Sequence, residues 1–114
     1  NEAAIARLIE TLTDRAFDRV HLVIGMLVDK PIEKIGAMLA PHVDQWYPVD
    51  LSGVTPRGAS AAELGSRLGQ GNEQAGFASP AAGLAAARSV ADAADCIVVC
   101  GSFYTVARVR DPIT

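Results

Sequence analysis

The feature that most constrains this 114-residue chain is a run of five apolar residues that ends in a glycine, Cys96–Gly101. A short, continuous apolar run rich in β-branched residues is typical of a strand buried on both faces, as in a parallel sheet covered by helices. A second run of this kind, Val20–Gly25, also ends in glycine. Two such strands predict an α/β domain, in which ligands bind beyond the carboxyl ends of the strands.

The segments around these runs have the spacing of amphipathic helices. Apolar residues recur at intervals of three and four over residues 1–12, where Asn1 can act as the N-cap, and again over residues 31–39. Further helices are predicted over residues 60–68, where Ser60 and Glu63 form a capping box, over 79–94 and over 102–110. A third strand is predicted over residues 44–49.

This alternation predicts a three-layer α/β fold, in which a mostly parallel sheet carries helices on both faces in a Rossmann-like arrangement. Residues 1–114 are expected to form a single domain. An α/β chain usually begins with a strand, whereas this sequence begins with a helical pattern. We therefore expect that a first strand is missing upstream.

Composition excludes several classes of function. The formal charge is -3 and the basic residues are scattered, so no nucleic-acid partner is expected. No apolar run approaches the ~20 residues of a membrane span, so no membrane partner is expected. Cys96 and Cys100 lie about 13 Å apart along one strand at ~3.3 Å per residue, which is too far for a disulfide. Two buried thiols fit a cytoplasmic location.

Candidate binding residues follow the two buried strands. Ser102 either caps the final predicted helix or, with the free N–H groups of that helix, holds an anion such as a carboxylate. Asp29 and Lys30 occupy the equivalent loop after the neighbouring strand, either as a solvated pair or as part of the same crevice. Arg57 is a substrate clamp or an exposed charge, and we favour the exposed charge.

Other motifs argue against further chemistry. The sequence contains no Gly-x-x-x-x-Gly-Lys-Ser/Thr loop, and the glycines of residues 69–76 do not fit the dinucleotide-binding pattern. His21 and His42 lie far apart in the predicted fold, so we expect structural roles for both. We expect no metal site.

Three segments occur in the order and at the spacing of a known family: residues 23–30 (VIGMLVDK), residues 44–47 (DQWY) with 56–60 (PRGAS) behind them, and residues 98–106 (VVCGSFYTV). Together they resemble the C-terminal domain of bacterial dihydrofolate synthase/folylpolyglutamate synthase, within the Mur ligase superfamily. The resemblance covers essentially the whole chain.

The resemblance implies a lobe of an ATP-dependent ligase that joins L-glutamate to dihydropteroate or to a folylpolyglutamate through an acyl phosphate. ATP and Mg²⁺ would be held mainly by an N-terminal ATPase domain, and this lobe would carry no cofactor and no catalytic residue of its own. Ser102 would contact the glutamate carboxylate, with Phe103 and Tyr104 as neighbouring walls. The partners implied are that ATPase domain, glutamate and the folate substrate, in a monomer.

Two departures from the family pattern qualify this interpretation. Asn1 is the only remnant of an Asp-x-Ala-His-Asn motif, and Pro31 replaces the acidic residue that usually follows Lys30. We therefore expect a fragment that is inactive alone, with Asn1, Asp29 and Lys30 as cleft residues. Two alternatives stay open: a free-standing, non-catalytic α/β binding module, and the C-terminal domain of a ligase for cell-wall precursors. The choice between dihydropteroate and folylpolyglutamate also stays open.

Overall fold

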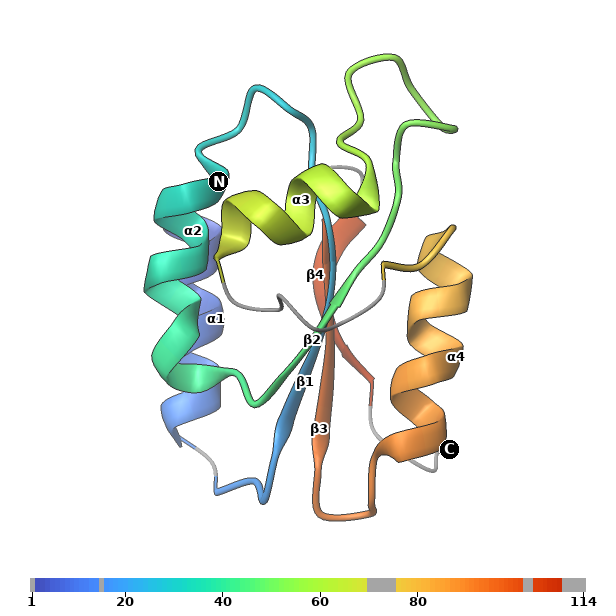
Figure 1. The fold of residues 1–114 in the computed structure, drawn as a ribbon. Coiled ribbons are helices and arrows are strands. Elements are labelled where there is room, and N and C mark those ends of the chain that lie inside the picture. Colours follow the sequence, from blue (N-terminus) through green and yellow to red (C-terminus); the bar gives the residue numbers. More distant parts are fainter. Residues whose placement is uncertain (1, 15, 70–75, 102–103, 110–114) are drawn as a thin grey trace.

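The computed structural model describes residues 2–14, 16–69, 76–101 and 104–109. Helices and strands alternate through most of the chain (Figure 1). In chain order the elements are α1 (Glu2–Asp14), β1 (Val20–Gly25), α2 (Ile32–Leu39), the 3₁₀ helix η1 (Ala40–His42), β2 (Gln45–Pro48), α3 (Ala61–Leu68), α4 (Pro80–Val90), β3 (Cys96–Gly101) and β4 (Tyr104–Val109). The predicted α/β fold is confirmed.

The strands form one sheet in the order β2-β1-β3-β4. β1 pairs in parallel with both β2 and β3, whereas β4 pairs antiparallel with β3. In the β1–β3 pair, Val20 lies opposite Cys96 and Gly25 lies opposite Gly101. The two apolar runs are therefore the two central strands. Every residue of β1 is buried, which explains why its sequence lacks the alternation of a half-exposed strand.

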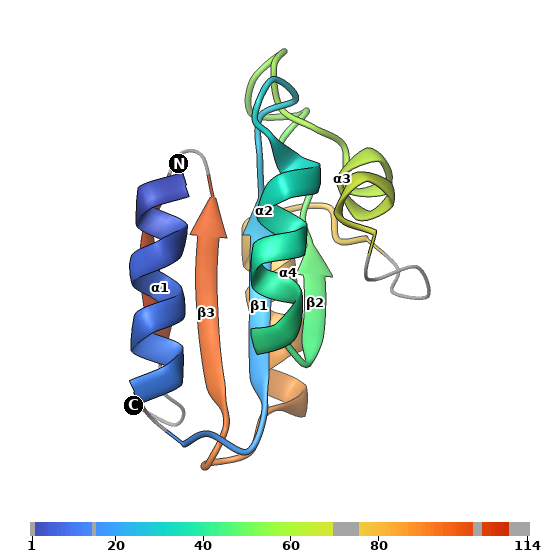
Figure 2. The ribbon, with the colours of Figure 1, turned by 90° about the vertical axis from the view of Figure 1, so that its left-hand side faces the viewer.

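Helices cover both faces of the sheet (Figure 2). α1 and α2 lie over one face, where Leu22 and Ile24 of β1 join the larger hydrophobic core. α3 packs against α2 and contributes Leu64 and Leu68 to the same core. α4 lies on the other face, where Val23 belongs to a second, smaller core. The period of two along β1 thus divides its side chains between two helical layers.

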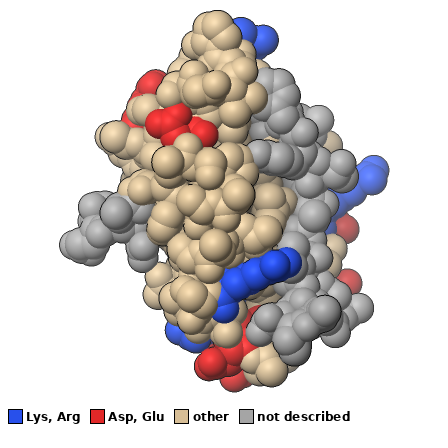
Figure 3. All heavy atoms as spheres, turned by 90° about the vertical axis from the view of Figure 1, so that its right-hand side faces the viewer, with Lys and Arg blue, Asp and Glu red and all other residues tan. Residues whose placement is uncertain are grey.

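The layer formed by α4 is thin, as its alanine-rich sequence predicts. A Cβ atom added at Gly83 would lie 2.5 Å from Cγ1 of Val49, and Ala87 is completely buried. The helix therefore sits directly on the sheet, because small side chains permit a close approach. Its outer surface carries few charged side chains (Figure 3).

The predicted final helix over residues 102–110 is wrong, because Tyr104–Val109 form strand β4. Gly101 pairs with Tyr104, and Ile97 pairs with Val109, so the chain turns back along β3. The apolar spacing of three that indicated a helix competes here with aromatic and β-branched residues, which favour a strand. The open edge of β3 supplies the hydrogen-bond partners that decide the competition.

Serine side chains cap the N-termini of α3 and α4, as predicted for Ser60. Ser60 Oγ accepts a hydrogen bond from the N–H of Glu63 at 3.1 Å, and Ser79 Oγ accepts one from the N–H of Ala82 at 3.1 Å. α4 ends at Val90 rather than at residue 94, because Ala91 already has an extended conformation with ψ at 142°. The prediction of a further strand ahead of α1 concerns no described residue and stays a prediction. Within the described ranges, no helix has the length and apolarity needed to cross a bilayer.

Candidate functional site

The carboxyl ends of the parallel strands meet at one edge of the sheet. Gly25 and Gly101 are register partners, and Ile24 lies opposite Pro48 at the end of β2. The chain therefore leaves β1, β2 and β3 from adjacent positions. Ser102 follows Gly101 directly in the sequence, and Asp29 and Lys30 follow Gly25 within five residues. The prediction that these strands end next to one another is confirmed.

Main-chain hydrogen bonds join the loop after β1 to the loop after β2. The N–H of Val28 donates to the carbonyl of Arg57 at 2.7 Å, and the N–H of Ala59 donates to the carbonyl of Met26 at 2.9 Å. Between them, Leu27 and Gly58 form an isolated antiparallel bridge. The two loops thus form one hydrogen-bonded unit, which we call the edge platform and define as residues 26–31 and 50–60.

Gly58 makes the close contact inside the platform possible. A Cβ atom at this position would lie 2.1 Å from the carbonyl oxygen of Leu51, so no other residue fits without a shift of the backbone. The N–H of Leu51 also donates to the carbonyl of Ala59 at 3.0 Å. The Pro-Arg-Gly sequence is therefore a packing requirement of the platform as well as part of the family resemblance.

Four charged residues belong to the platform: Asp29, Lys30, Asp50 and Arg57. Arg57 donates a hydrogen bond to Asp29, and both side chains are more than half exposed. This hydrogen bond holds the pKa of the Asp29 carboxyl below its ordinary value, with the charges of Arg57 and Lys30 acting in the same direction. The partner of Asp29 is thus Arg57 rather than Lys30. Within the described residues the Lys30 ammonium group has no ion-pair partner, which leaves a cation at the edge that can receive an anion.

Arg67, in the last turn of α3, binds the main chain of the loop after β1 through its side chain. Its Nη1 donates to the carbonyl of Val28 at 2.7 Å, and its Nη2 donates to the carbonyl of Lys30 at 3.1 Å. The same guanidinium group binds both carboxylate oxygens of Glu33, at 2.9 and 3.1 Å. The sequence did not single out Arg67, because its only signal there was a basic side chain near a helix C-terminus.

Of the other predicted site residues, only Tyr104 lies within the described part of the chain. Asn1, Ser102 and Phe103 lie outside the described residues, so their roles stay predictions. Tyr104 is the first residue of β4 and pairs with Gly101. No helix begins after Ser102, since β4 follows, and the hypothesis that the N–H groups of a final helix hold an anion is therefore wrong. A contact between Ser102 and a carboxylate does not depend on that helix.

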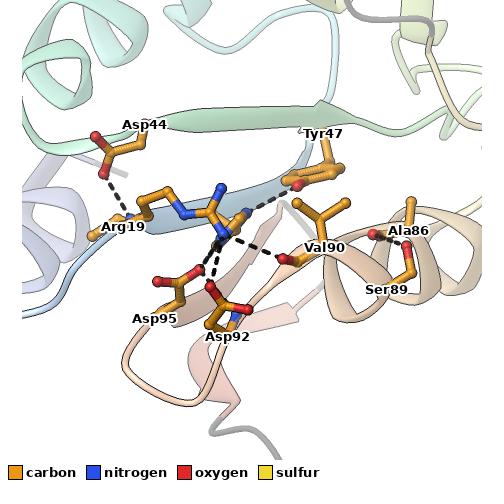
Figure 4. A network of polar contacts seen from close by, with 10 residues as sticks. Arg19, Asp44, Tyr47, Ala86, Ser89, Val90, Asp92 and Asp95 are labelled. Carbon is orange, nitrogen blue, oxygen red and sulfur yellow. Dashed lines mark hydrogen bonds and ion pairs between the residues drawn. The ribbon is translucent and has the colours of Figure 1, made fainter.

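A second polar cluster lies at the amino end of the sheet (Figure 4). His21 is completely buried, and its Nδ1 and Nε2 atoms lie 2.9 Å from the Tyr47 hydroxyl and from Oδ2 of Asp95, respectively. Arg19 reaches the same Asp95 oxygen at 3.0 Å. An ionised Asp95 can only accept, so Nε2 of His21 donates, and in the neutral ring Nδ1 accepts from Tyr47.

Burial and charge together determine the titration of this cluster. Burial opposes ionisation of Asp95, but hydrogen bonds from His21 and from the N–H of Asp92, with the charge of Arg19, hold its pKa below the ordinary value. Burial raises the pKa of Tyr47. The side chains of His21 and Asp95 at the centre of the cluster are completely buried, and only Arg19 and its partner Asp92 reach the surface, so the cluster serves the fold rather than a ligand. This confirms the structural role predicted for His21.

The described residues contain no group of three or more His, Cys, Asp or Glu side chains that could hold a metal ion. Cys96 and Cys100 are buried thiols, and burial raises the pKa of Cys100 to about 11. A thiol that titrates so high stays protonated near neutral pH and is a poor metal ligand. Mg²⁺ takes oxygen ligands, and the described residues bring no cluster of carboxylates together for it, so no chemical step is assigned to a metal here.

The fold and the edge platform define a doubly wound α/β domain whose ligand edge lies at the carboxyl ends of its parallel strands. The family described as "Mur ligase, glutamate ligase domain" matches residues 1–103. The chain belongs to this family.

Named relatives agree with this family. The chain is 47% identical over 95 residues to the dihydrofolate synthase/folylpolyglutamate synthase of Escherichia coli (strain K12). A solved structure of E. coli FolC in complex with DHPP and ADP aligns with a TM-score of 0.80 at 40% identity, over 92% of this chain. A solved bifunctional folylpolyglutamate synthase/dihydrofolate synthase with Mn, AMPPNP and L-glutamate bound aligns over 91% of this chain, with a TM-score of 0.77 at 36% identity.

The relatives are much longer than this chain. The 95 matched residues are 83% of this chain but 21% of the E. coli enzyme, and the two solved structures are each covered to 24%. The similarity therefore concerns one domain of a multidomain ligase, and it confirms the family resemblance found in the sequence.

Proposed function

We propose that this chain is the glutamate-side lobe of an ATP-dependent ligase that joins L-glutamate to dihydropteroate or to a folylpolyglutamate. The proposed reaction forms an amide between the glutamate amine and a carboxylate that has been activated as an acyl phosphate. The family supports a glutamate ligase, and the relatives support the folate branch over a ligase for cell-wall precursors. The chain spans about a quarter of these relatives, and the part proposed for it is glutamate binding.

The observation that carries this proposal is the pairing of Gly25 with Gly101. Because these residues end adjacent parallel strands, the loop with Lys30 and the residue that follows Gly101 in the sequence, Ser102, both come after the same end of the sheet. An ammonium group and a hydroxyl group near each other suit a carboxylate, which accepts charge-assisted hydrogen bonds. Phe103 and Tyr104 would form the walls beside the glutamate, and Asn1 would approach the same cleft.

ATP and Mg²⁺ belong, in this proposal, to an N-terminal ATPase domain of the same polypeptide. The chain has no phosphate-binding Gly-x-x-x-x-Gly-Lys-Ser/Thr loop, and its described residues form no metal site. Closure of the two domains would bring the edge platform against the nucleotide-loaded partner. The ligase would act as a cytoplasmic monomer, and this lobe alone would be inactive.

Ser102→Ala in the complete ligase tests the proposal. We expect the KM for glutamate to rise about tenfold or more, because a hydrogen bond to a charged group contributes about 1.5–3 kcal/mol. The KM for ATP should change little. Ser66→Ala is a matched control, since Ser66 is an exposed serine on α3. An unchanged glutamate KM in Ser102→Ala would remove Ser102 from the site.

A further inference from the structure

Main-chain hydrogen bonds hold most of the loop after β1. The carbonyl of Met26 and the N–H of Val28 pair with the strand-like segment around Gly58, and the N–H of Ile32 donates to the carbonyl of Lys30 at 2.8 Å. The loop also contains a tight turn, in which the N–H of Lys30 donates to the carbonyl of Leu27 at 3.2 Å. The carbonyl of Val28 is left outside this main-chain pattern. The positions of the Asp29 and Lys30 side chains, at the tip of the loop, depend on how this part of the main chain is held.

Arg67 supplies the missing support. Its side chain is about three-quarters buried, and the guanidinium group donates to the carbonyls of Val28 and Lys30 at once. These two carbonyls flank Asp29. One planar side chain from α3 therefore fixes the main chain on both sides of the loop tip, in the gap between two helices that pack against each other.

The charge of Arg67 is already balanced. Glu33 accepts two hydrogen bonds from the guanidinium group, and the carboxylate of Glu63 lies 3.8 Å from Nη1. An arginine neutralised in this way is poorly suited to bind a substrate anion directly. Its geometry suits support of a loop instead, because a rigid fork of five N–H donors can bind two carbonyls and a carboxylate together.

We propose that Arg67 is a positioning residue for the glutamate site, acting through Lys30. By fixing the carbonyls of Val28 and Lys30, it holds the loop in the conformation in which the Lys30 ammonium group meets the glutamate carboxylate. Glu33 orients the guanidinium group for this task. The inference rests on the proposed function, and it adds a residue that touches neither glutamate nor nucleotide.

The test measures steady-state kinetics of the complete ligase with Arg67→Met and Arg67→Lys. In Arg67→Met we expect the KM for glutamate to rise about tenfold, because binding must then pay for ordering the loop. The KM for ATP and kcat should stay within about twofold. Arg67→Lys keeps the charge but cannot bind two carbonyls and a carboxylate together, so it should give an intermediate KM and serves as the test if Arg67→Met does not fold. Arg88→Met, on the exposed side of α4, is the control.

A double-mutant cycle with Lys30→Met separates positioning from a general structural role. If Arg67 acts through Lys30, Arg67→Met should cause no further rise in glutamate KM once Lys30 is methionine. An undiminished rise in that background, or an unchanged glutamate KM in Arg67→Met and Arg67→Lys, overturns the inference.

The proposed function can fail separately. If Ser102→Ala raises the glutamate KM and the Arg67 variants do not, only the role of Arg67 is lost. If Ser102→Ala, Lys30→Met and Arg67→Met all leave the glutamate KM unchanged, the glutamate site at this edge and the role of Arg67 are both lost.

Discussion

Both ends of the sheet carry an arginine–aspartate pair, but the surroundings of the two pairs differ. At the amino end, the side chain of Asp95 is completely buried and one of its oxygens accepts from both Arg19 and His21. At the carboxyl end, Arg57 and Asp29 pair with 62% and 52% of their side chains exposed. The same two residue types therefore serve the fold at one end and remain accessible to a ligand at the other.

The difference follows from the cost of burying charge. Removing one partner of a buried ion pair leaves the other charge without compensation and strongly destabilises a protein. An exposed pair is screened by water and contributes little to stability. The amino end should therefore tolerate few substitutions, whereas Asp29, Lys30 and Arg57 can change with little effect on folding. The side chains at the carboxyl ends of the strands can therefore differ without a large loss of folding stability.

The largest expected effect is that of Asp95→Ala. This change leaves the N–H of His21 and the guanidinium group of Arg19 without their carboxylate, so the free energy of unfolding should fall by about 3 kcal/mol. Denaturant titration followed by circular dichroism measures it. Asp29→Ala is the control from the exposed pair and should leave the unfolding midpoint unchanged. Equal effects of the two variants would contradict the contrast between the two ends.

Gly58→Ala should have the next largest effect. A Cβ at Gly58 would lie 2.1 Å from the carbonyl oxygen of Leu51, so the backbone of the edge platform must move, at an expected cost of about 1–3 kcal/mol. Gly53 lies in the same loop, and a Cβ there meets no atom within 4 Å. Gly53→Ala should therefore fold normally. Thermal unfolding of both variants tests this, and similar melting temperatures would show that the platform tolerates a shift at Gly58.

The smallest predicted effect is on the acid dependence of stability. The pKa of Asp95 is lower in the folded protein than in the unfolded chain. Its contribution is therefore complete above the unfolded-state pKa and is lost as the pH falls through the folded-state pKa. Asp95→Asn should show a shallower loss of stability on acidification than the unchanged protein. Denaturant titrations at a series of acidic pH values measure both slopes, and parallel curves would exclude this role for Asp95.

The sequence was most informative about the centre of the fold. The runs that form β1 and β3 are apolar apart from His21 because both faces of the strands are covered, and that pattern is strong in the sequence itself. It was least informative about β4. There the residues suited both a helix and a strand, and the decision depended on the free edge of β3, a partner that lies outside any local window.

The candidate site was predicted in part, for similar reasons. Asp29 and Lys30 were found because they follow a buried strand. The pairing of Asp29 with Arg57 and the support from Arg67 were not found, because they join residues 28 to 39 positions apart. Asp95 gave no signal either, since a single acidic residue before a strand resembles an ordinary loop residue. Contacts between distant segments decide these roles.

Phe77 pairs beside β2 and so affects whether the edge of this strand can associate with another molecule. The N–H of Phe77 donates to the carbonyl of Pro48, and the N–H of Asp50 donates to the carbonyl of Phe77. Pro48 itself has no N–H to offer. The outer rim is therefore occupied at the carboxyl end of β2, which hinders the pairing of a strand from another molecule at that point.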